Sequence, residues 1–131
     1  MTPESPTEFE PFHFTSSIED GWLTVLHIQG DFDSEAVGES GLLLRETIES
    51  GTRWLLIDML EVKYIDSPAF GMLGGVVKQT EDRGGCLSVA CDSPVLVKLF
   101  GRSDTKEFFN TRSSIEEARS LLETKRNASE A

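Results

Sequence analysis

Asp66, Ser67 and Pro68 stand together where an apolar run, LLIDML, has ended and a glycine-rich segment begins. These residue types suit the start of a helix, because a serine side chain can accept a hydrogen bond from a free backbone amide and proline fits the first turn. We therefore expect Ser67 to be the N-cap and Pro68 to be the first residue of a helix. A serine in this position has two further possible roles, as a catalytic nucleophile or as part of a weak anion site.

The sequence around Ser67 lacks the motifs that catalysis and nucleotide binding usually require. No GxSxG surrounds Ser67, and the two histidines, His13 and His27, fall in segments with strand character, where a packed or surface role is typical. No P-loop is present, so the helix start at 67–69 leaves only weak nucleotide binding as an alternative. The sequence therefore predicts that the protein is not an enzyme and carries no cofactor or metal.

The helix that begins near Ser67 has two faces of different composition. Ser67, Gly71, Gly74 and Lys78 fall together on one side of a helical wheel. A continuous apolar arc on the other side must face the core; it contains Ala69, Phe70, Met72, Leu73, Val76 and Val77. Glycine in a helix costs about 1 kcal/mol relative to alanine. The glycines therefore either avoid a clash with a neighbouring loop or let a partner approach closely.

The charge of the chain excludes several classes of partner. Its 131 residues include 12 Lys and Arg against 23 Asp and Glu, which gives a formal net charge of −11. Such a field repels polyanions, so nucleic acid and anionic membrane surfaces are poor partners. No apolar stretch approaches the roughly 20 residues of a membrane span, and the N-terminus lacks the features of a signal peptide. We expect a cytoplasmic protein.

Hydrophobic periodicity and turn signals predict the elements that position Ser67. The Asp-Gly in EDG is typical of a hairpin joining strands at 12–18 and 22–28. A helix follows at 34–50, with Asp33 or Ser34 as its N-cap. The remaining expected elements are a strand at 53–59, a helix at 67–85, a strand at 86–92, a short helix at 93–101, a small edge strand at 107–110 and a helix at 113–124.

This order, ββαβαβα(β)α, indicates an α/β fold. Strand and helix alternate after the hairpin, so the later strands should be parallel, in a mixed sheet of four to five strands with the helices mainly on one face. We expect one domain at 12–124, a disordered segment at 1–11 and a flexible tail at 125–131, because both ends offer little to bury. Cys86 and Cys91 should lie on opposite faces of a strand, too far apart to form a disulfide.

The segment from Leu55 to Phe109, together with IQGDFD at 28–33, resembles the STAS domains of bacterial anti-sigma factor antagonists. The resemblance covers Phe12 to about Leu122. It rests on the Asp-Ser step at a helix start, the earlier Gly-x-x-Asp that ends at Asp33, and the Gly-Gly at 84–85 before the next strand. It implies the two-layer α/β fold of that family, in agreement with the predicted order of elements.

The resemblance also implies a function. These antagonists bind an anti-sigma factor, which is also a serine kinase, and thereby free a sigma factor; phosphorylation ends the binding, and a phosphatase acts on the phosphorylated form. By position, Ser67 is the implied phosphoacceptor, with Asp66 beside it and Asp33 near the same edge. We expect the partner-binding surface to comprise Asp33, Asp66, Ser67, Pro68, Gly71, Gly74 and Lys78.

The sequence departs from the family pattern directly after Ser67. Pro68 and Ala69 stand where these antagonists commonly have a second hydroxyl residue and a glycine. Proline removes one backbone donor and stiffens the chain. Two alternatives therefore stay open beside the switch: a STAS scaffold of a stress-signalling complex that is not phosphorylated, and a separate regulatory subunit of a transporter.

Overall fold

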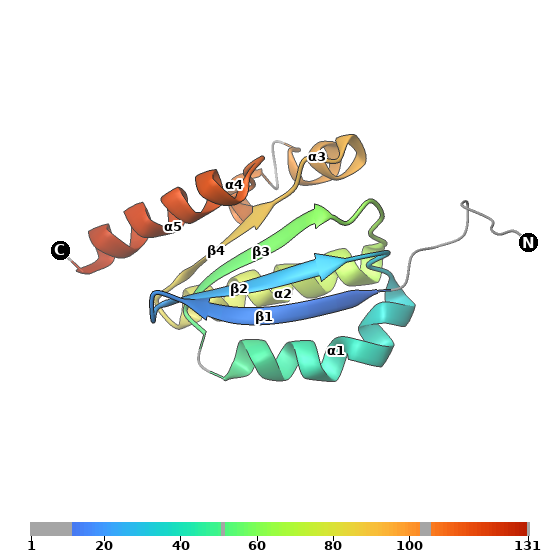
Figure 1. Cartoon of the computed structure of the whole chain (residues 1–131), viewed down its shortest axis with the longest axis horizontal. Coiled ribbons are helices and arrows are strands. Elements are labelled where there is room, and N and C mark those ends of the chain that lie inside the picture. Colours follow the sequence, from blue (N-terminus) through green and yellow to red (C-terminus); the bar gives the residue numbers. More distant parts are fainter. Residues whose placement is uncertain (1–11, 51, 103–105, 131) are drawn as a thin grey trace, which may run out of the picture.

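The computed structural model describes residues 12–50, 52–102 and 106–130, and a four-stranded sheet runs through its centre (Figure 1). The strands are β1 (His13–Glu19), β2 (Leu23–Gln29), β3 (Trp54–Glu61) and β4 (Cys86–Ala90), and they lie in that order across the sheet. β1 pairs antiparallel with β2, whereas the β2–β3 and β3–β4 pairs are parallel. The mixed sheet and the α/β class are as the sequence predicts.

The turn between β1 and β2 has the backbone conformation that is typical of an Asp-Gly sequence. Asp20 and Gly21 both have positive φ angles, 54° and 76°, which suit a turn that follows the twist of the two strands. Aspartate tolerates this region better than most residues, and glycine adopts it without steric cost. The predicted hairpin is therefore confirmed, with each strand one residue further along the chain than expected.

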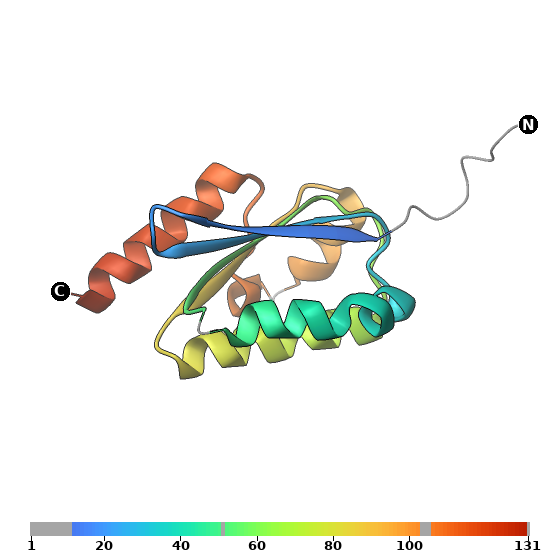
Figure 2. The ribbon, with the colours of Figure 1, turned by 60° about the horizontal axis from the view of Figure 1, so that its bottom comes forward.

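Helices cover both faces of the sheet (Figure 2). α1 (Ser34–Glu49) and α2 (Ser67–Asp82) lie side by side against one face, and the short helices α3 (Pro94–Phe100) and α4 (Lys106–Phe109) complete that side. α5 (Ile115–Glu130) packs on the opposite face, against β3 and β4. Four of the five described helices thus share one face, and the last covers part of the other.

Two hydrophobic cores follow from the alternation of side chains along the strands. Leu26, Ile57 and Val89 point toward α1 and α2, where they join the larger core. Val25, Leu56 and Ala90 are their neighbours in sequence and point the other way, toward Ala118 and Leu122 of α5. Because β3 and β4 are covered on both faces, their sequences are nearly continuous apolar runs.

The C-terminal end of α2 is joined to that of α1 by a single arginine. Arg83, the C-cap of α2, donates from Nη1 to the carbonyl oxygen of Ile48 at 2.7 Å and to that of Thr52 at 3.3 Å. The guanidinium thus satisfies carbonyl groups at and after the end of α1, where the helix dipole favours a positive charge.

Two local predictions are wrong. The small edge strand expected at 107–110 does not form. Residues 106–109 are α4 instead, because Phe109 is buried against the rings of Phe70 and Phe100 and does not pair with β4. Residues 125–130, expected in a flexible tail, continue α5 to Glu130, where Arg126 lies 4.7 Å from the centre of the Trp22 ring. The segment expected to be disordered, 1–11, lies outside the described residues.

Both cysteines are free and buried. Cys86 belongs to the core beneath α5, and Cys91 belongs to the core beneath α1 and α2. Their placement on opposite faces confirms the prediction from their spacing, and it keeps the two thiols from forming a disulfide in the folded chain.

Candidate functional site

The loops that follow β2 and β3 pair with each other, and this pairing brings the starts of α1 and α2 together. Phe32 and Ile65 form an isolated parallel bridge. The backbone N–H of Phe32 donates to the carbonyl oxygen of Tyr64 at 3.0 Å, and the N–H of Asp66 donates to the carbonyl oxygen of Phe32 at 3.2 Å. The carboxyl ends of parallel strands meet at one edge of a sheet, so this is where the fold presents its loop residues.

One carboxylate caps both helices at this edge. Asp66 Oδ1 accepts a hydrogen bond from the backbone N–H of Ala69 at 3.1 Å, which is the N-cap bond of its own helix. Asp66 Oδ2 accepts a second hydrogen bond, at 2.6 Å, from the backbone N–H of Ser34 at the start of α1. Asp33 in turn caps α1, with Oδ1 accepting from the N–H of Ala36 at 2.9 Å. Asp33 and Asp66 are therefore brought together, as expected, but through backbone amides.

Ser67 is not the N-cap of α2, so that prediction is wrong. Asp66 holds the N-cap position with an extended backbone, φ −103° and ψ 176°, and Ser67 and Pro68 are the first two helical residues. A carboxylate is the better cap here, because it is charged and the helix N-terminus is positive. Within the described residues, the exposed Ser67 hydroxyl makes no hydrogen bond. It is consequently free to react or to contact a partner.

The polar stripe on α2 is only partly open. Gly71 and Lys78 are exposed as expected, and a Cβ at Gly71 would meet no described atom within 4 Å. Gly74 is half-buried, and a Cβ there would lie 3.8 Å from the ring of Phe108 on α4. Gly74, which we expect in the partner-binding surface, is therefore only partly accessible. Gly75, one residue on, is exposed instead, with open space around its Cα.

An aromatic residue that the sequence reasoning missed lies at the same edge. Tyr64 is 50% exposed in the loop before Asp66, and its carbonyl oxygen takes part in the pairing of the two loops. The sequence feature that could have identified Tyr64 is its position in a loop, two residues before the Asp-Ser step. We use the name Ser67 surface for the exposed residues Tyr64, Ser67, Pro68, Gly71 and Lys78.

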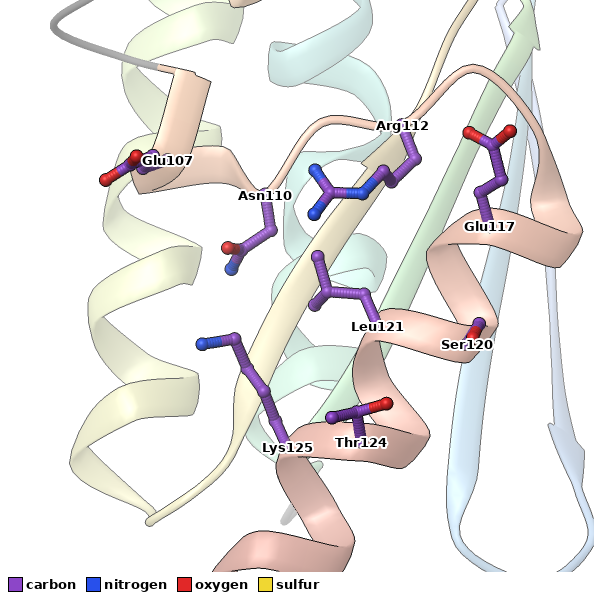
Figure 3. A pocket seen from close by; sticks show the side chains of 8 residues that line it. All are labelled: Glu107, Asn110, Arg112, Glu117, Ser120, Leu121, Thr124 and Lys125. Carbon is purple, nitrogen blue, oxygen red and sulfur yellow. The ribbon is translucent and has the colours of Figure 1, made fainter.

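The other polar features lie away from this surface. A cavity of about 790 Å³ opens between α4 and α5, where Arg112 and Lys125 lie near Asn110 (Figure 3). None of the predicted site residues lines it. His27 binds Asp58 on the neighbouring strand, with 2.8 Å between Nδ1 and Oδ2. Among the described residues, no group of His, Cys, Asp and Glu is arranged to hold a metal ion.

No helix in the described part of the chain has the length and apolar character to cross a membrane. A comparison with protein-family models matches the STAS domain over residues 14–118, which includes β1 to β4, both capping aspartates and Ser67. The chain belongs to the STAS domain family. The match ends within α5, so the last turns of that helix extend past it.

Solved structures share this STAS fold at low sequence identity. An anti-sigma factor antagonist from Mycobacterium paratuberculosis has a TM-score of 0.76 and 14% identity, over 86% of this chain and 95% of that one. The phosphorylated form of the Bacillus cell fate determinant SpoIIAA has a TM-score of 0.65 and 20% identity, over 84% of this chain and 99% of that one. A comparison with curated proteins found no match.

The same fold also occurs as part of a larger protein. A murine anion transporter of the Solute Carrier 26 family has a TM-score of 0.62 and 12% identity, over 90% of this chain and 23% of that one. At these identities the likenesses show the fold alone. The roles of individual residues must therefore be argued from the site itself.

Proposed function

We propose that this STAS domain is an anti-sigma factor antagonist, which binds an anti-sigma factor through the Ser67 surface and is switched off by phosphorylation of Ser67. One observation carries the proposal. Asp66, and not Ser67, caps α2. The Ser67 hydroxyl is therefore exposed, and it makes no hydrogen bond within the described residues. A kinase can reach it without disturbing α2.

The position of Ser67 also suits a phosphate group. The first residue of a helix lies at the positive end of the helix dipole, which stabilises an anion by roughly 0.3 to 1 kcal/mol. Phosphorylation adds about −1.5 to −2 charge units. That is a small change for a chain with a net charge of −11, so the effect on binding must be local. The added dianion would stand beside the Asp66 carboxylate and project into any partner seated on the Ser67 surface.

The proposed partner is an anti-sigma factor that is also a serine kinase. Such a kinase transfers the γ-phosphoryl group of ATP to Ser67 Oγ, the hydroxyl proton is lost, and ADP leaves. This chain supplies only the acceptor hydroxyl and the docking surface, so it acts as a binding protein and not as an enzyme. A phosphatase would return it to the binding form, and the whole cycle would take place in the cytoplasm.

Pull-down from the native cell extract tests the proposal. Immobilised wild type and Ser67→Ala should both retain a kinase-like ATPase, whereas Ser67→Asp and the phosphorylated protein should retain it at least about a hundredfold less. Ser120→Asp is the matched control, because it places the same charge at an exposed position on α5. Equal retention by Ser67→Asp and Ser67→Ala would contradict the switch.

A second candidate function is a STAS scaffold that is never phosphorylated, and Pro68 is the observation in its favour. Proline as the second residue of α2 fixes the backbone next to the hydroxyl, which restricts how the chain can enter a kinase active site. Incubating the wild type with the captured ATPase and ATP distinguishes the two functions. The switch requires that the chain gains one phosphate, located at Ser67 by peptide mapping, and the scaffold requires that it gains none.

A further inference from the structure

The two edges of the sheet differ in how they are protected. At the β4 edge, the N–H of Arg112 donates to the carbonyl oxygen of Val89, and the N–H of Cys91 donates to that of Arg112. The Asn110 side chain also donates to the carbonyl oxygen of Leu87 at 2.9 Å. At the β1 edge, in contrast, no other described segment pairs with the strand. One edge is closed by the chain itself, and the other has no pairing partner within residues 12–50, 52–102 and 106–130.

The open strand lacks the features that usually prevent edge-to-edge pairing. Exposed edge strands are normally interrupted by charges, prolines or bulges. β1 has neither a charged residue nor a proline between Phe14 and Ile18, and its pairing with β2 is regular along its whole length. Ile18 is 71% exposed, more than any other large apolar residue described. In the part of the chain that the structure describes, the strand therefore presents both unpaired backbone groups and an exposed apolar side chain.

The sequence of β1 is complementary to itself when two copies run antiparallel about Ser16. The opposed residues are then His13 with Glu19, Phe14 with Ile18, Thr15 with Ser17, and Ser16 with its own copy. Apolar residues meet apolar residues, hydroxyls meet hydroxyls, and no like charges face each other. Such pairs are the units that stabilise an antiparallel sheet.

The fold places the apolar pair where it is useful. Phe14 already packs against the core beneath α1 and α2, and Ile18, four residues further along the strand, points to the same face. Ile18 of a second copy would lie beside Phe14 and extend that core across the junction. We propose that β1 binds β1 of a second copy of this chain, giving a two-fold symmetric dimer in which the two sheets are continuous.

Two features of the chain limit the strength of this dimer. A junction of one strand per subunit is smaller than a standard protein interface, so association is weak. Each subunit also carries a net charge of −11, and the two subunits repel each other until salt screens them. Dimer formation should therefore increase with protein concentration and with ionic strength. The proposal does not rest on the function assigned to Ser67.

Sedimentation equilibrium of the full chain tests the dimer. The average mass of the wild type should rise toward twice that of one chain between about 10 µM and about 1 mM, and more steeply in added salt. Ile18→Lys should stay monomeric over the same range. Val95→Lys is the matched control, because Val95 is also apolar and 62% exposed but lies on α3, and it should behave as the wild type does.

A cysteine at the two-fold axis tests the register. Ser16→Cys places two thiols opposite each other, so mild oxidation should give a disulfide-linked dimer, while Ser120→Cys on α5 should cross-link at least tenfold more slowly. The native cysteines are buried and should not interfere. A wild type that stays monomeric up to about 1 mM overturns the proposal, and so does a dimer that persists in Ile18→Lys, since it must use another surface.

Discussion

Asp66 Oδ2 accepts a hydrogen bond from the backbone N–H of Ser34 at 2.6 Å, although 32 positions separate the two residues in the chain. The same carboxylate caps α2 through Ala69. A single side chain therefore satisfies free amides at the starts of two helices, and the position of the Ser67 surface depends on it.

Replacing Asp66 should cost more than replacing an ordinary cap. Asp66→Ala removes two charge-assisted hydrogen bonds, so we expect a loss of about 2–3 kcal/mol in the free energy of unfolding. Asp33→Ala removes one capping bond and should cost about 1 kcal/mol. Urea unfolding of both variants measures the difference. Equal losses would mean that the bond to Ser34 contributes nothing.

Ser67→Ala should leave stability almost unchanged. The hydroxyl makes no hydrogen bond within the described residues, and Asp66 retains the cap, so we expect a change within about 0.5 kcal/mol. Any loss of binding in a Ser67 variant can then be read as an effect on the surface. A loss of 1 kcal/mol or more in urea unfolding would show that Ser67 supports the helix start after all.

Two glycines should respond to alanine in opposite directions. A Cβ at Gly85 would stand 1.7 Å from the carbonyl oxygen of Arg53, which also accepts the N–H of Cys86, so Gly85→Ala should cost about 1–3 kcal/mol. Gly71→Ala fills open space on an exposed helix and should gain up to about 1 kcal/mol. Thermal unfolding distinguishes them. If Gly71→Ala stabilises the fold but weakens partner binding, the glycine serves the partner.

The two thiols should be protected in the folded chain. Burial raises the pKa of Cys91 to about 11 and also raises the pKa of Cys86 above its usual value. At pH 8 a thiol reagent should therefore label the native protein at the rate of unfolding, and the denatured protein at once. Rapid labelling of either cysteine in the native state would contradict this prediction.

The same shift sets a dependence of stability on pH. The folded state keeps the Cys91 proton to higher pH than the unfolded state, whose thiol has a pKa of about 8.5. The contribution of this thiol to the free energy of unfolding is thus fully present below about pH 8.5. It declines as the pH rises toward about 11, the pKa of Cys91 in the folded state. Urea unfolding between these limits should show a decline that is smaller in Cys91→Ala.

Local patterns were sufficient for most of the elements and for the core. The apolar arc of α2 was correct because helical spacing alone decides which side chains face the sheet: Ala69, Leu73 and Val77 are all buried. Alternation placed Cys86 and Cys91 on opposite faces for the same reason. The hairpin followed from Asp20 and Gly21, since few residue types tolerate positive φ angles.

The errors concern interactions between distant segments. Aspartate and serine both occur as N-caps, and no local pattern reveals the pairing with the Phe32 loop that helps to place Asp66 at the cap of α2. Phenylalanine favours strands, but Phe109 is buried against Phe70 and Phe100. This packing favours a helix in the segment that contains it. The same applies to Gly74, whose exposure is reduced by Phe108 from a helix later in the chain.

Arg83 gives the Ser67 surface a mechanical property. Asp66 fastens α2 to α1 at their N-terminal ends, and Arg83 fastens them at their C-terminal ends, through Ile48. Two helices held at both ends resist rotation and sliding against each other, so we expect the pair to move as one rigid unit. A phosphate on Ser67 would change the charge and shape of its surface without changing the arrangement of the two helices. We therefore expect a partner to sense the modification through charge and steric fit, with the backbone of α1 and α2 the same in both states.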